Sequence, residues 1–260
     1  RTGVNTKAVI DAVKARLAQI SPGLPAGVRV VPFYDRSELI DVREEIRSAC
    51  RQGIRLIVES FVPFERELSV LVVRGLDGST VVYPIAENKH DEGILRTTVV
   101  PARMSSLLAT RIGELAKRAV EQLDGVGVFC LELFELSGEQ VLINEIAPRP
   151  HNSGHYTLDA CSVSQFEQQV RSICGLPLGK AGLSQPAVMV NLIGDEVTRI
   201  TQGDCRTLLA MPGAVLHLYG KRTLRPRRKM GHVTFMDSHQ EAAKARALQL
   251  QECLAKSATA

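Results

Sequence analysis

The chain has 260 residues, enough for one large domain or two small ones, and 45% of them are hydrophobic and 23% charged. Both fractions are ordinary for a globular protein, and a chain of this length can bury a sizeable core without disulfides or metals. Its formal net charge of +4 is too small to indicate nucleic-acid binding, and no apolar run reaches the roughly 18 residues that a membrane span needs.

The six cysteines show no CxxC pair and no His–Cys spacing of the kind that binds zinc. Cys130 lies within an apolar, strand-like run, where a buried reduced thiol is the ordinary interpretation. The chain does not open with a signal-peptide pattern. We therefore expect a reducing compartment, a cytoplasmic protein and no membrane partner.

Residues 5–20 place apolar side chains on one helical face and Lys and Arg on the other, which predicts an amphipathic helix. A Pro-Gly-Leu-Pro break and a short strand follow. Residues 1–42 resemble a periplasmic segment of heavy-metal efflux pumps of the resistance-nodulation-division class, through the words RTGVNTKAVIDAVKARLAQISPGLPAGVRVVPFYDRSELID. They contain no cluster of Cys, His or Met that could bind a soft metal, so we interpret them as an appended fragment.

After a charged connector at residues 43–53, strand and helix patterns alternate. Strands are predicted at residues 56–62, 66–75, 80–87, 187–194, 214–221 and 229–236, and on both sides of Ser137-Gly138. The strands that flank Leu76-Asp77-Gly78 are expected to form a hairpin. Helices are predicted at about 102–123, 164–175 and 239–256. Hairpins and strands that precede helices indicate an α+β architecture.

Glu132 and Glu145 each stand where the strand pattern would otherwise place a hydrophobic residue. If Gly138-Glu139 forms a two-residue turn, the paired positions are Leu136 with Val141, Phe134 with Ile143, and Glu132 with Glu145. The two carboxylates would then face each other, with Cβ atoms about 5 Å apart. Either a proton or a divalent cation must relieve their repulsion, and the adjacent amide of Asn144 favours Mg²⁺. A solvated sheet edge without a ligand is the alternative.

A polar loop, APRPHNSGH, follows the strand that carries Glu145 and brings Arg149, His151, Asn152 and His155 close together. A single histidine would more often be a structural residue, but this concentration of donors beside two carboxylates suits an anionic, phosphate-like reactant. The basic segment GKRTLRPRRKMGH at 220–232 contains no interleaved aromatic residues. It therefore fits a small phosphorylated ligand at least as well as a nucleic acid, and no nucleic-acid partner is predicted.

Residues from about 54 to 238 resemble the C-terminal part of the 5-(carboxyamino)imidazole ribonucleotide synthase family, within the ATP-grasp superfamily. The words that carry this resemblance are IVESFVPFERELSV, GSTVVYPIAENKHDEGILRTT, GVGVFCLELFE, INEIAPRPHNSGH, SQFEQQVRSI, VMVNLIG and LYGK…RPRRKMGHVT. The resemblance implies an ATP-grasp core at 54–180, with a mixed, largely antiparallel sheet and flanking helices. It also implies a small rudiment-single-hybrid-like β segment and a terminal helix at 181–260.

The reaction that the resemblance implies is the ATP-dependent carboxylation of 5-aminoimidazole ribonucleotide by bicarbonate, with ADP and phosphate as products and carboxyphosphate as the intermediate. The implied cofactors are ATP and Mg²⁺, with Mn²⁺ as a second metal. Residues implied to contact the nucleotide are Glu59, Ser60, Phe61 and Val62 at the adenine hinge, Glu67 at the ribose, and His90, Asn144 and Glu145. Glu132 and Glu145 would bind the metal.

By the same resemblance, Arg149, His151 and Asn152 would hold bicarbonate or carboxyphosphate as catalytic residues. Lys221 is implied as both a catalytic and a substrate-binding residue, and Arg228 as a substrate-binding residue. The family is also associated with homodimers. Clustered cations are the shared physical requirement, because three anionic reactants must lie close together.

Two departures from the family pattern bear on function. Arg227 stands where the family has glycine, so a side chain replaces free rotation in that turn. Residues 1–53 contain neither the Gly-rich phosphate loop nor the lid lysines of the family, which predicts impaired catalysis. Two alternatives therefore stay open: a non-catalytic module for nucleotide binding or dimerisation, and a metal-efflux accessory based on residues 1–42.

Overall fold

In the computed structural model, residues 47, 51–53 and 60–256 are described. The chain divides into two compact units, Arg1–Phe61 and Val62–Ala260. The predicted efflux-pump-like segment, most of the connector and the start of the strand at 56–62 lie outside the described residues. Within the described part of the chain, no helix has the length and apolar character needed to cross a membrane.

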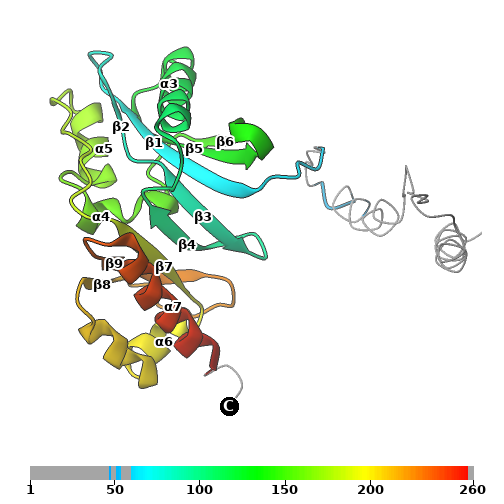
Figure 1. The fold of residues 1–260 in the computed structure, drawn as a ribbon, viewed down its shortest axis with the longest axis vertical. Helices are drawn as coiled ribbons and strands as arrows, with labels where there is room; N and C mark the ends of the chain where they lie inside the picture. The colour runs from blue at the N-terminus through cyan, green and yellow to red at the C-terminus, as the bar shows by residue number, and fades with distance from the viewer. Residues whose placement is uncertain (1–46, 48–50, 54–59, 257–260) are drawn as a thin grey trace, which may run out of the picture. The chain divides into compact units, whose positions relative to one another are not determined.

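The second unit is built on one antiparallel sheet with the strand order β6-β5-β1-β3-β4-β7-β9-β8, and β2 pairs with β1 (Figure 1). The strands are β1 Arg66–Arg74, β2 Thr80–Val82, β3 Ala86–Asp91, β4 Ile94–Val100, β5 Gly127–Leu136, β6 Gln140–Ala147, β7 Ala187–Ile193, β8 Ala214–Leu218 and β9 Lys229–Met236. Because β7 pairs with β4, the strands of residues 181–260 extend the sheet of the preceding segment.

The strand predicted at 80–87 divides into β2 and the beginning of β3. Strand β4 follows, and the sequence pattern did not predict it. Pro84 lies between the two parts and has no N–H to donate, so the ladder with β1 cannot run through it. The predicted hairpin between β1 and β2 is confirmed, with Val72 opposite Val82.

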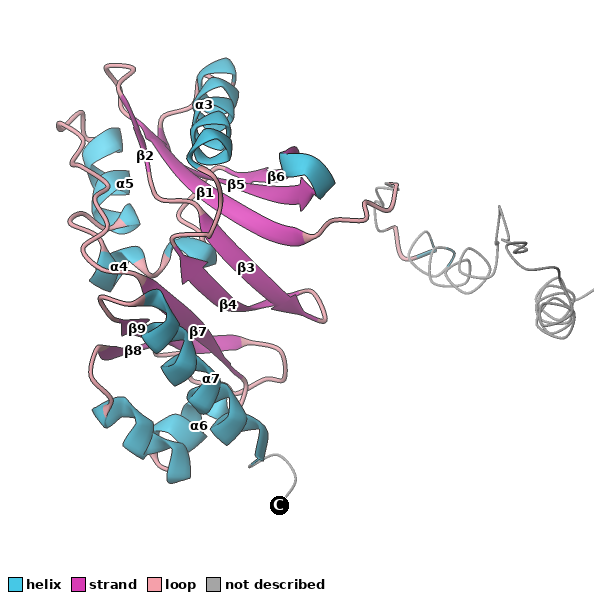
Figure 2. Ribbon diagram, viewed as in Figure 1, coloured by secondary structure: helices cyan, strands magenta, loops and turns pink. Residues whose placement is uncertain are grey.

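The two faces of β1 pack against different layers, as alternation requires. Leu68, Val70 and Val72 join the core that contains α3 (Ser106–Gln122), whereas Leu71 and Val73 pack into a cluster with Cys130. Figure 2 shows α3 over the β1 end of the sheet and α7 (Gln240–Lys256) over the end formed by β7 and β9.

Helix α3 begins at Ser106, later than predicted, because the Ser105 hydroxyl caps it by accepting from the N–H of Leu108 at 3.1 Å. Its buried face repeats every four residues: Leu108, Ile112, Ala116 and Val120. Leu107 precedes the buried Leu108 but is 65% exposed, because adjacent residues of a helix point about 100° apart.

Helix α5 (Gln165–Ile173) has an inverted pattern of burial. Its polar side chains, Gln165, Gln168 and Ser172, are buried, whereas the apolar Val170 and Ile173 are 54% and 55% exposed. The short helix α4 (Thr157–Ala160) precedes it. Burial of a glutamine is tolerated when its amide is hydrogen-bonded, and Gln168 meets this condition through the backbone of Gly179. Its apolar stripe is left facing outward.

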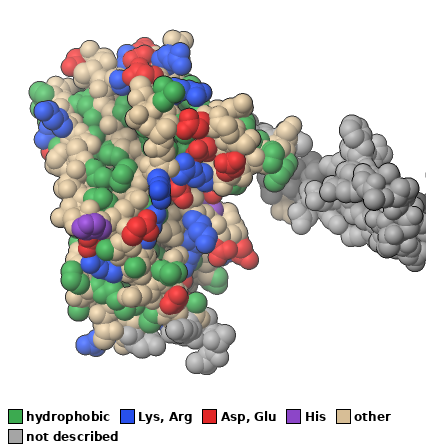
Figure 3. Space-filling model, in the orientation of Figure 1, with side chains coloured by type: hydrophobic (Ala, Val, Ile, Leu, Met, Phe, Trp, Pro, Cys, Tyr) green, Lys and Arg blue, Asp and Glu red, His purple; other side chains and the backbone are tan. Residues whose placement is uncertain are grey.

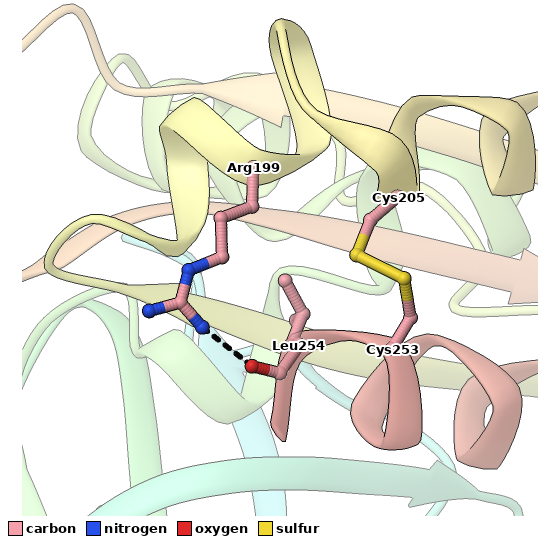
Figure 4. The surroundings of a disulfide bond; sticks show 4 residues. All are labelled: Arg199, Cys205, Cys253 and Leu254. Atoms are coloured by element: carbon pink, nitrogen blue, oxygen red, sulfur yellow. Dashed lines mark hydrogen bonds between the residues drawn. A yellow bond between two sulfur atoms is a disulfide. The ribbon is translucent and has the colours of Figure 1, made fainter. Parts of the chain in front are cut away.

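The C-terminal helix α7 is tied to the segment after β7, which contains α6 (Glu196–Thr201) and the 3₁₀ helix η4 (Asp204–Ala210). A disulfide joins Cys205 to Cys253, and Arg199 donates to the carbonyl of Leu254 at 2.5 Å (Figure 4). The expectation of reduced thiols is therefore wrong for this pair, whose partners lie 48 positions apart. Cys130 is a free, buried thiol, as predicted.

Candidate active site

Glu132 on β5 lies opposite Glu145 on β6, as predicted, but a different route produces this register. The connection is a three-residue loop, Ser137–Glu139, in which Gly138 and Glu139 both have positive φ. The first pairs of the hairpin are therefore Leu136 with Gln140 and Phe134 with Leu142, each one residue away from the prediction. A bulge then leaves Asn144 without a partner of its own and restores the pairing of the two acids.

Glu132 is the more enclosed of the two acids, with 19% of its side chain exposed, whereas Glu145 is exposed. Burial raises the pKa of Glu132, and the neighbouring charge of Glu145 raises it further. This is the electrostatic signature expected of a carboxylate pair that lacks a counter-ion. Glu67 on β1 and His90 on β3 lie within electrostatic reach and contact each other at 2.7 Å.

The loop after β6 places His151 Nε2 3.1 Å from Glu132 Oε1. Gln165 of α5 holds the loop, because its amide accepts from the His151 N–H and donates to the His151 carbonyl, both at 2.8 Å. Burial lowers the pKa of His151 to about 4, with smaller effects from nearby cations, so the ring is neutral at pH 7. Arg149 is exposed and donates to the carbonyl of Pro150.

Asn152 is joined to the neighbouring strands by a reciprocal amide pair. It donates to Asn191 at 3.0 Å and accepts from it at 2.7 Å, and Asn191 lies on β7. Its amide also lies 3.5 Å from the hydroxyl of Tyr219, which contacts His232 Nδ1 at 2.9 Å. Asn191 and Tyr219 were not predicted as site residues. The polar Asn191 within the apolar run AVMVNLIG was a signal that could have identified it.

The basic segment brings Lys221 and Lys229 together, because the Lys221 ammonium donates to the Lys229 carbonyl at 2.5 Å. Lys229 also acts electrostatically on Glu132 and His151, so it belongs to the site, although it was not predicted. Burial lowers the pKa of Lys221, and the charge of Arg228 lowers it further. Arg228 is half-buried and donates to the carbonyl of Thr223 at 3.1 Å.

Arg227 has a φ of 64°, in the left-handed region that favours glycine. The departure from the family pattern therefore falls at a position where a side chain strains the backbone by about 1 kcal/mol. Its guanidinium forms an ion pair with Glu92 in the turn between β3 and β4. This contact offsets part of the strain.

The predicted adenine hinge is only partly open to description. Glu59 lies outside the described residues, and Ser60 and Phe61 belong to the first unit, where Phe61 is 89% exposed. The carbonyl of Val62 accepts from the N–H of Phe64 at 3.0 Å. The contribution of these residues to nucleotide binding stays a prediction.

A second group of polar residues, Asp159, His217 and His232, is joined to the site through the contact of Tyr219 with His232. His217 Nε2 is 3.0 Å from the Asp159 carboxylate, and the two imidazoles stack with ring centroids 4.6 Å apart at 17°. A metal ion binds an imidazole nitrogen in the plane of its ring. Nearly parallel rings that lie face to face share no such point, so we interpret this group as a stack and not as a metal centre.

Comparison with known proteins identifies the family. Residues 36–166 match the model of the ATP-grasp domain, and residues 187–246 match that of the phosphoribosylaminoimidazole carboxylase C-terminal domain. The chain belongs to the ATP-grasp family. The resemblance stated for residues 54–238 is thus confirmed, as is the ATP-grasp fold. The resemblance of residues 1–42 to an efflux pump is not shown and stays a prediction.

Three relatives illustrate how this ATP-grasp chain aligns. N5-carboxyaminoimidazole ribonucleotide synthase of Bacillus subtilis is 46% identical over 78% of this chain and 53% of the relative. The crystal structure of the phosphoribosylaminoimidazole carboxylase ATPase subunit of Aquifex aeolicus has a TM-score of 0.70 and 36% identity, over 84% of this chain and 71% of that chain. The crystal structure of N5-carboxyaminoimidazole synthase of Aspergillus clavatus in complex with ADP and 5-aminoimidazole ribonucleotide has a TM-score of 0.77 and 30% identity. The match covers 93% of this chain and 65% of that chain. The chain spans about half the length of the curated N5-carboxyaminoimidazole ribonucleotide synthases that it matches, and about a third of the length of the curated phosphoribosylaminoimidazole carboxylases.

Proposed function

We propose that this chain contributes the metal, nucleotide and bicarbonate sites of a 5-(carboxyamino)imidazole ribonucleotide synthase. The overall reaction consumes ATP, bicarbonate and 5-aminoimidazole ribonucleotide and forms the N-carboxylated ribonucleotide, ADP and phosphate. The observation that carries the proposal is the placement of Glu132 opposite Glu145, with a neutral imidazole 3.1 Å from Glu132. Facing carboxylates repel unless a cation or a proton intervenes.

The donor set at this position fits Mg²⁺ or Mn²⁺. Glu132 and Glu145 supply carboxylate oxygens, the exposed Asn144 amide lies between them in sequence, and no thiolate or imidazole is needed. When bound, the metal would neutralise charge on the ATP phosphates. We propose that Glu67 and His90, which contact each other on adjacent strands, bind the nucleotide beside this pair.

The chain's own residues would then hold the anionic reactants. A bicarbonate oxygen attacks the γ-phosphorus and ADP leaves; the amine of the ribonucleotide then attacks the carboxyl carbon and phosphate leaves. Arg149 supplies an exposed cation, and His151 and Asn152 supply hydrogen-bond donors from a loop fixed by Gln165 and Asn191. We propose that Lys221 and Arg228 hold the ribonucleotide phosphate or the carboxyl group.

Mg²⁺-ATP is the first ligand to test. We expect it to raise the melting temperature of the full chain and EDTA to abolish that shift. Phosphate release should rise when bicarbonate and 5-aminoimidazole ribonucleotide are both present. A shift without substrate-dependent phosphate release would favour the nucleotide-binding module, and a shift only with Cu⁺ or Zn²⁺ would favour the metal-efflux accessory. The absence of both a Mg²⁺-ATP shift and phosphate release would contradict the proposal.

We further propose that the chain forms a homodimer through the outward face of α5. Phe166, Val170 and Ile173 form an exposed apolar stripe, flanked by the ion pair of Glu167 and Arg171. If two α5 helices cross antiparallel about a twofold axis near Gln169, Glu167 lies beside Arg171 of the partner subunit. Phe166 then lies beside Ile173 of the partner subunit, so one surface is complementary to itself in charge and in apolar contact.

Val170→Glu is expected to convert the dimer to a monomer, because it places two carboxylates at the centre of the apolar contact. Light scattering after size-exclusion chromatography measures this directly. Leu248→Glu is the matched control, since Leu248 is similarly exposed, at 55%, but lies on α7. A wild-type monomer at high protein concentration, or a dimer that survives Val170→Glu, would contradict the interface. A cytoplasmic location is proposed with this function, because its substrates are intermediates of central metabolism.

A further inference from the structure

A chain of buried polar side chains runs through the sheet and ends at His151. Thr98 on β4 donates to Asn88 Oδ1 at 3.0 Å, and Asn88 Nδ2 on β3 donates to Ser69 Oγ on β1 at 2.8 Å. The Ser69 hydroxyl lies 3.0 Å from Ser153 Oγ, which lies 2.9 Å from His151 Nδ1. These groups lie in the interior of the sheet, where apolar residues are the norm. The first four residues are at most 6% exposed: Thr98, Asn88, Ser69 and Ser153.

The direction of the hydrogen bonds in this chain is set by groups that can only donate. The Asn88 amide donates to Ser69, which leaves the Ser69 proton for Ser153. The Ser153 hydroxyl then has two neighbours, His151 Nδ1 at 2.9 Å and Cys130 Sγ at 3.6 Å, and the imidazole nitrogen is the stronger acceptor. At the other end, the backbone N–H of Ser153 also points at His151 Nδ1, at 3.4 Å. A backbone N–H cannot reverse its role, so Nδ1 must be the acceptor.

The remaining ring nitrogen of His151 faces Glu132 Oε1 at 3.1 Å. Because Nδ1 accepts, the proton of the neutral ring is on Nε2, which places the ring N–H on the side nearest this carboxylate. The opposite tautomer would direct a nitrogen lone pair at a carboxylate oxygen and leave the Ser153 N–H without an acceptor at this point. The Ser153 hydroxyl would then have only Cys130 Sγ, a weak acceptor at 3.6 Å. Both ends of the imidazole therefore favour the same state.

We propose that Asn88, Ser69 and Ser153 are positioning residues that hold His151 in its Nε2–H tautomer, so that the ring orients Glu132 towards Glu145. Outer-shell hydrogen bonds of this kind orient metal-binding carboxylates and change metal affinity by roughly 10- to 100-fold when removed. In this arrangement His151 is a fixed hydrogen-bond donor to the site and not its general base. The predicted change in metal affinity rests on the proposed function, whereas the predicted tautomer does not.

The tautomer can be measured without any ligand, by long-range ¹H–¹⁵N NMR of histidine-labelled protein at pH 7.5. We expect His151 to show a protonated Nε2 and an unprotonated Nδ1. Ser153→Ala and Ser69→Ala should produce a mixture of tautomers, and Ser153→Thr should restore the Nε2–H form because it retains the hydroxyl. Asn88→Asp should move the population towards Nδ1–H, because a carboxylate accepts where the amide donated.

Thr234→Val is the matched control, because the Thr234 hydroxyl is buried without a hydrogen-bond partner among the described residues. It should leave the tautomer unchanged. Mn²⁺ titration of the same variants should show about 10-fold or greater weakening in Ser153→Ala and none in Thr234→Val. An Nδ1–H tautomer in the wild type, or an unaltered tautomer in both Ser69→Ala and Ser153→Ala, would overturn the proposal. Wild-type protein with the expected tautomer but no Mn²⁺ binding would instead contradict the proposed metal site.

Discussion

Glu132→Gln is expected to weaken Mn²⁺ or Mg²⁺ binding by about 100-fold, or ~3 kcal/mol, and to raise the melting temperature of the metal-free protein. The two effects have opposite signs because the carboxylate serves the ion and not the fold. Without metal, Glu132 is largely enclosed and faces the like charge of Glu145, and both effects raise its pKa. A neutral amide of the same shape removes the repulsion, and each kcal/mol relieved should raise the melting temperature by about 2–4 °C.

Glu135→Gln is the matched control for this prediction. Glu135 lies on the same strand and is 6% exposed, but its carboxylate pairs with Arg66 at 2.6 Å and lies away from Glu145. Removing one partner of a buried ion pair destabilises a protein, so Glu135→Gln should lower the melting temperature and leave metal affinity unchanged. Isothermal titration with Mn²⁺ and thermal unfolding in EDTA provide the two readouts. Equal metal affinity in wild type and Glu132→Gln would eliminate the pair as a metal site.

Acidification is expected to destabilise the fold strongly between pH 6.5 and 4.5, through the buried His151, His155 and His232. Burial lowers the pKa of His151 and of His155 to about 4 and that of His232 to about 3, with smaller effects from neighbouring cations and histidines. The folded state therefore keeps all three rings neutral, whereas the unfolded chain protonates them below about pH 6.5. Their stabilisation is complete above pH 6.5 and declines as the pH falls towards the folded-state values. At pH 4.5 the loss is roughly 2–3 kcal/mol for each histidine.

Urea unfolding at pH 7.5, 6.0, 5.0 and 4.5 would measure this decline. The other charged or titratable groups that face the three rings include His90, Arg149, His217 and Lys229, and they stay in place in the test. His155→Gln should reduce the acid-dependent loss of stability by about a third, because one of the three buried rings can no longer take up a proton. His239→Gln should not, since the His239 side chain is 86% exposed. If the free energy of unfolding falls equally steeply with decreasing pH in wild type and in His155→Gln, this explanation is refuted.

The surface of the second unit also bears on these measurements. On the face drawn in Figure 3, acidic and basic side chains are interspersed among polar and hydrophobic ones. Several pairs contact each other there and elsewhere, such as Lys117 with Glu114 and Lys244 with Glu241. Exposed pairs of this kind contribute little to stability and weaken with salt. Moderate salt should therefore leave the loss of stability at low pH that is attributed to the buried histidines largely unchanged.

Patterns within a few residues of one another determined much of this protein. The alternation along 66–75 and the four-residue repeat after Ser105 predict β1 and α3, because each face of a strand or helix is visible in its own sequence. The two acids in neighbouring apolar strands, and the donors that follow Glu145, identified the candidate site for the same reason. The motifs of residues 54–238 also predicted the family.

Only the tertiary structure decided the features that depend on distant partners. The three-residue turn shifts the first pairs of the β5–β6 hairpin by one residue from the prediction, and the bulge at Asn144 restores the pairing of Glu132 with Glu145. Asn191 contacts Asn152 across 39 positions, and Lys229 acts electrostatically on Glu132. Helix α5 turns its glutamines inward because a loop and a strand bond to their amides. Local propensity acts within one turn or one strand, whereas a hydrogen bond between two elements exists only after the sheet has brought them together.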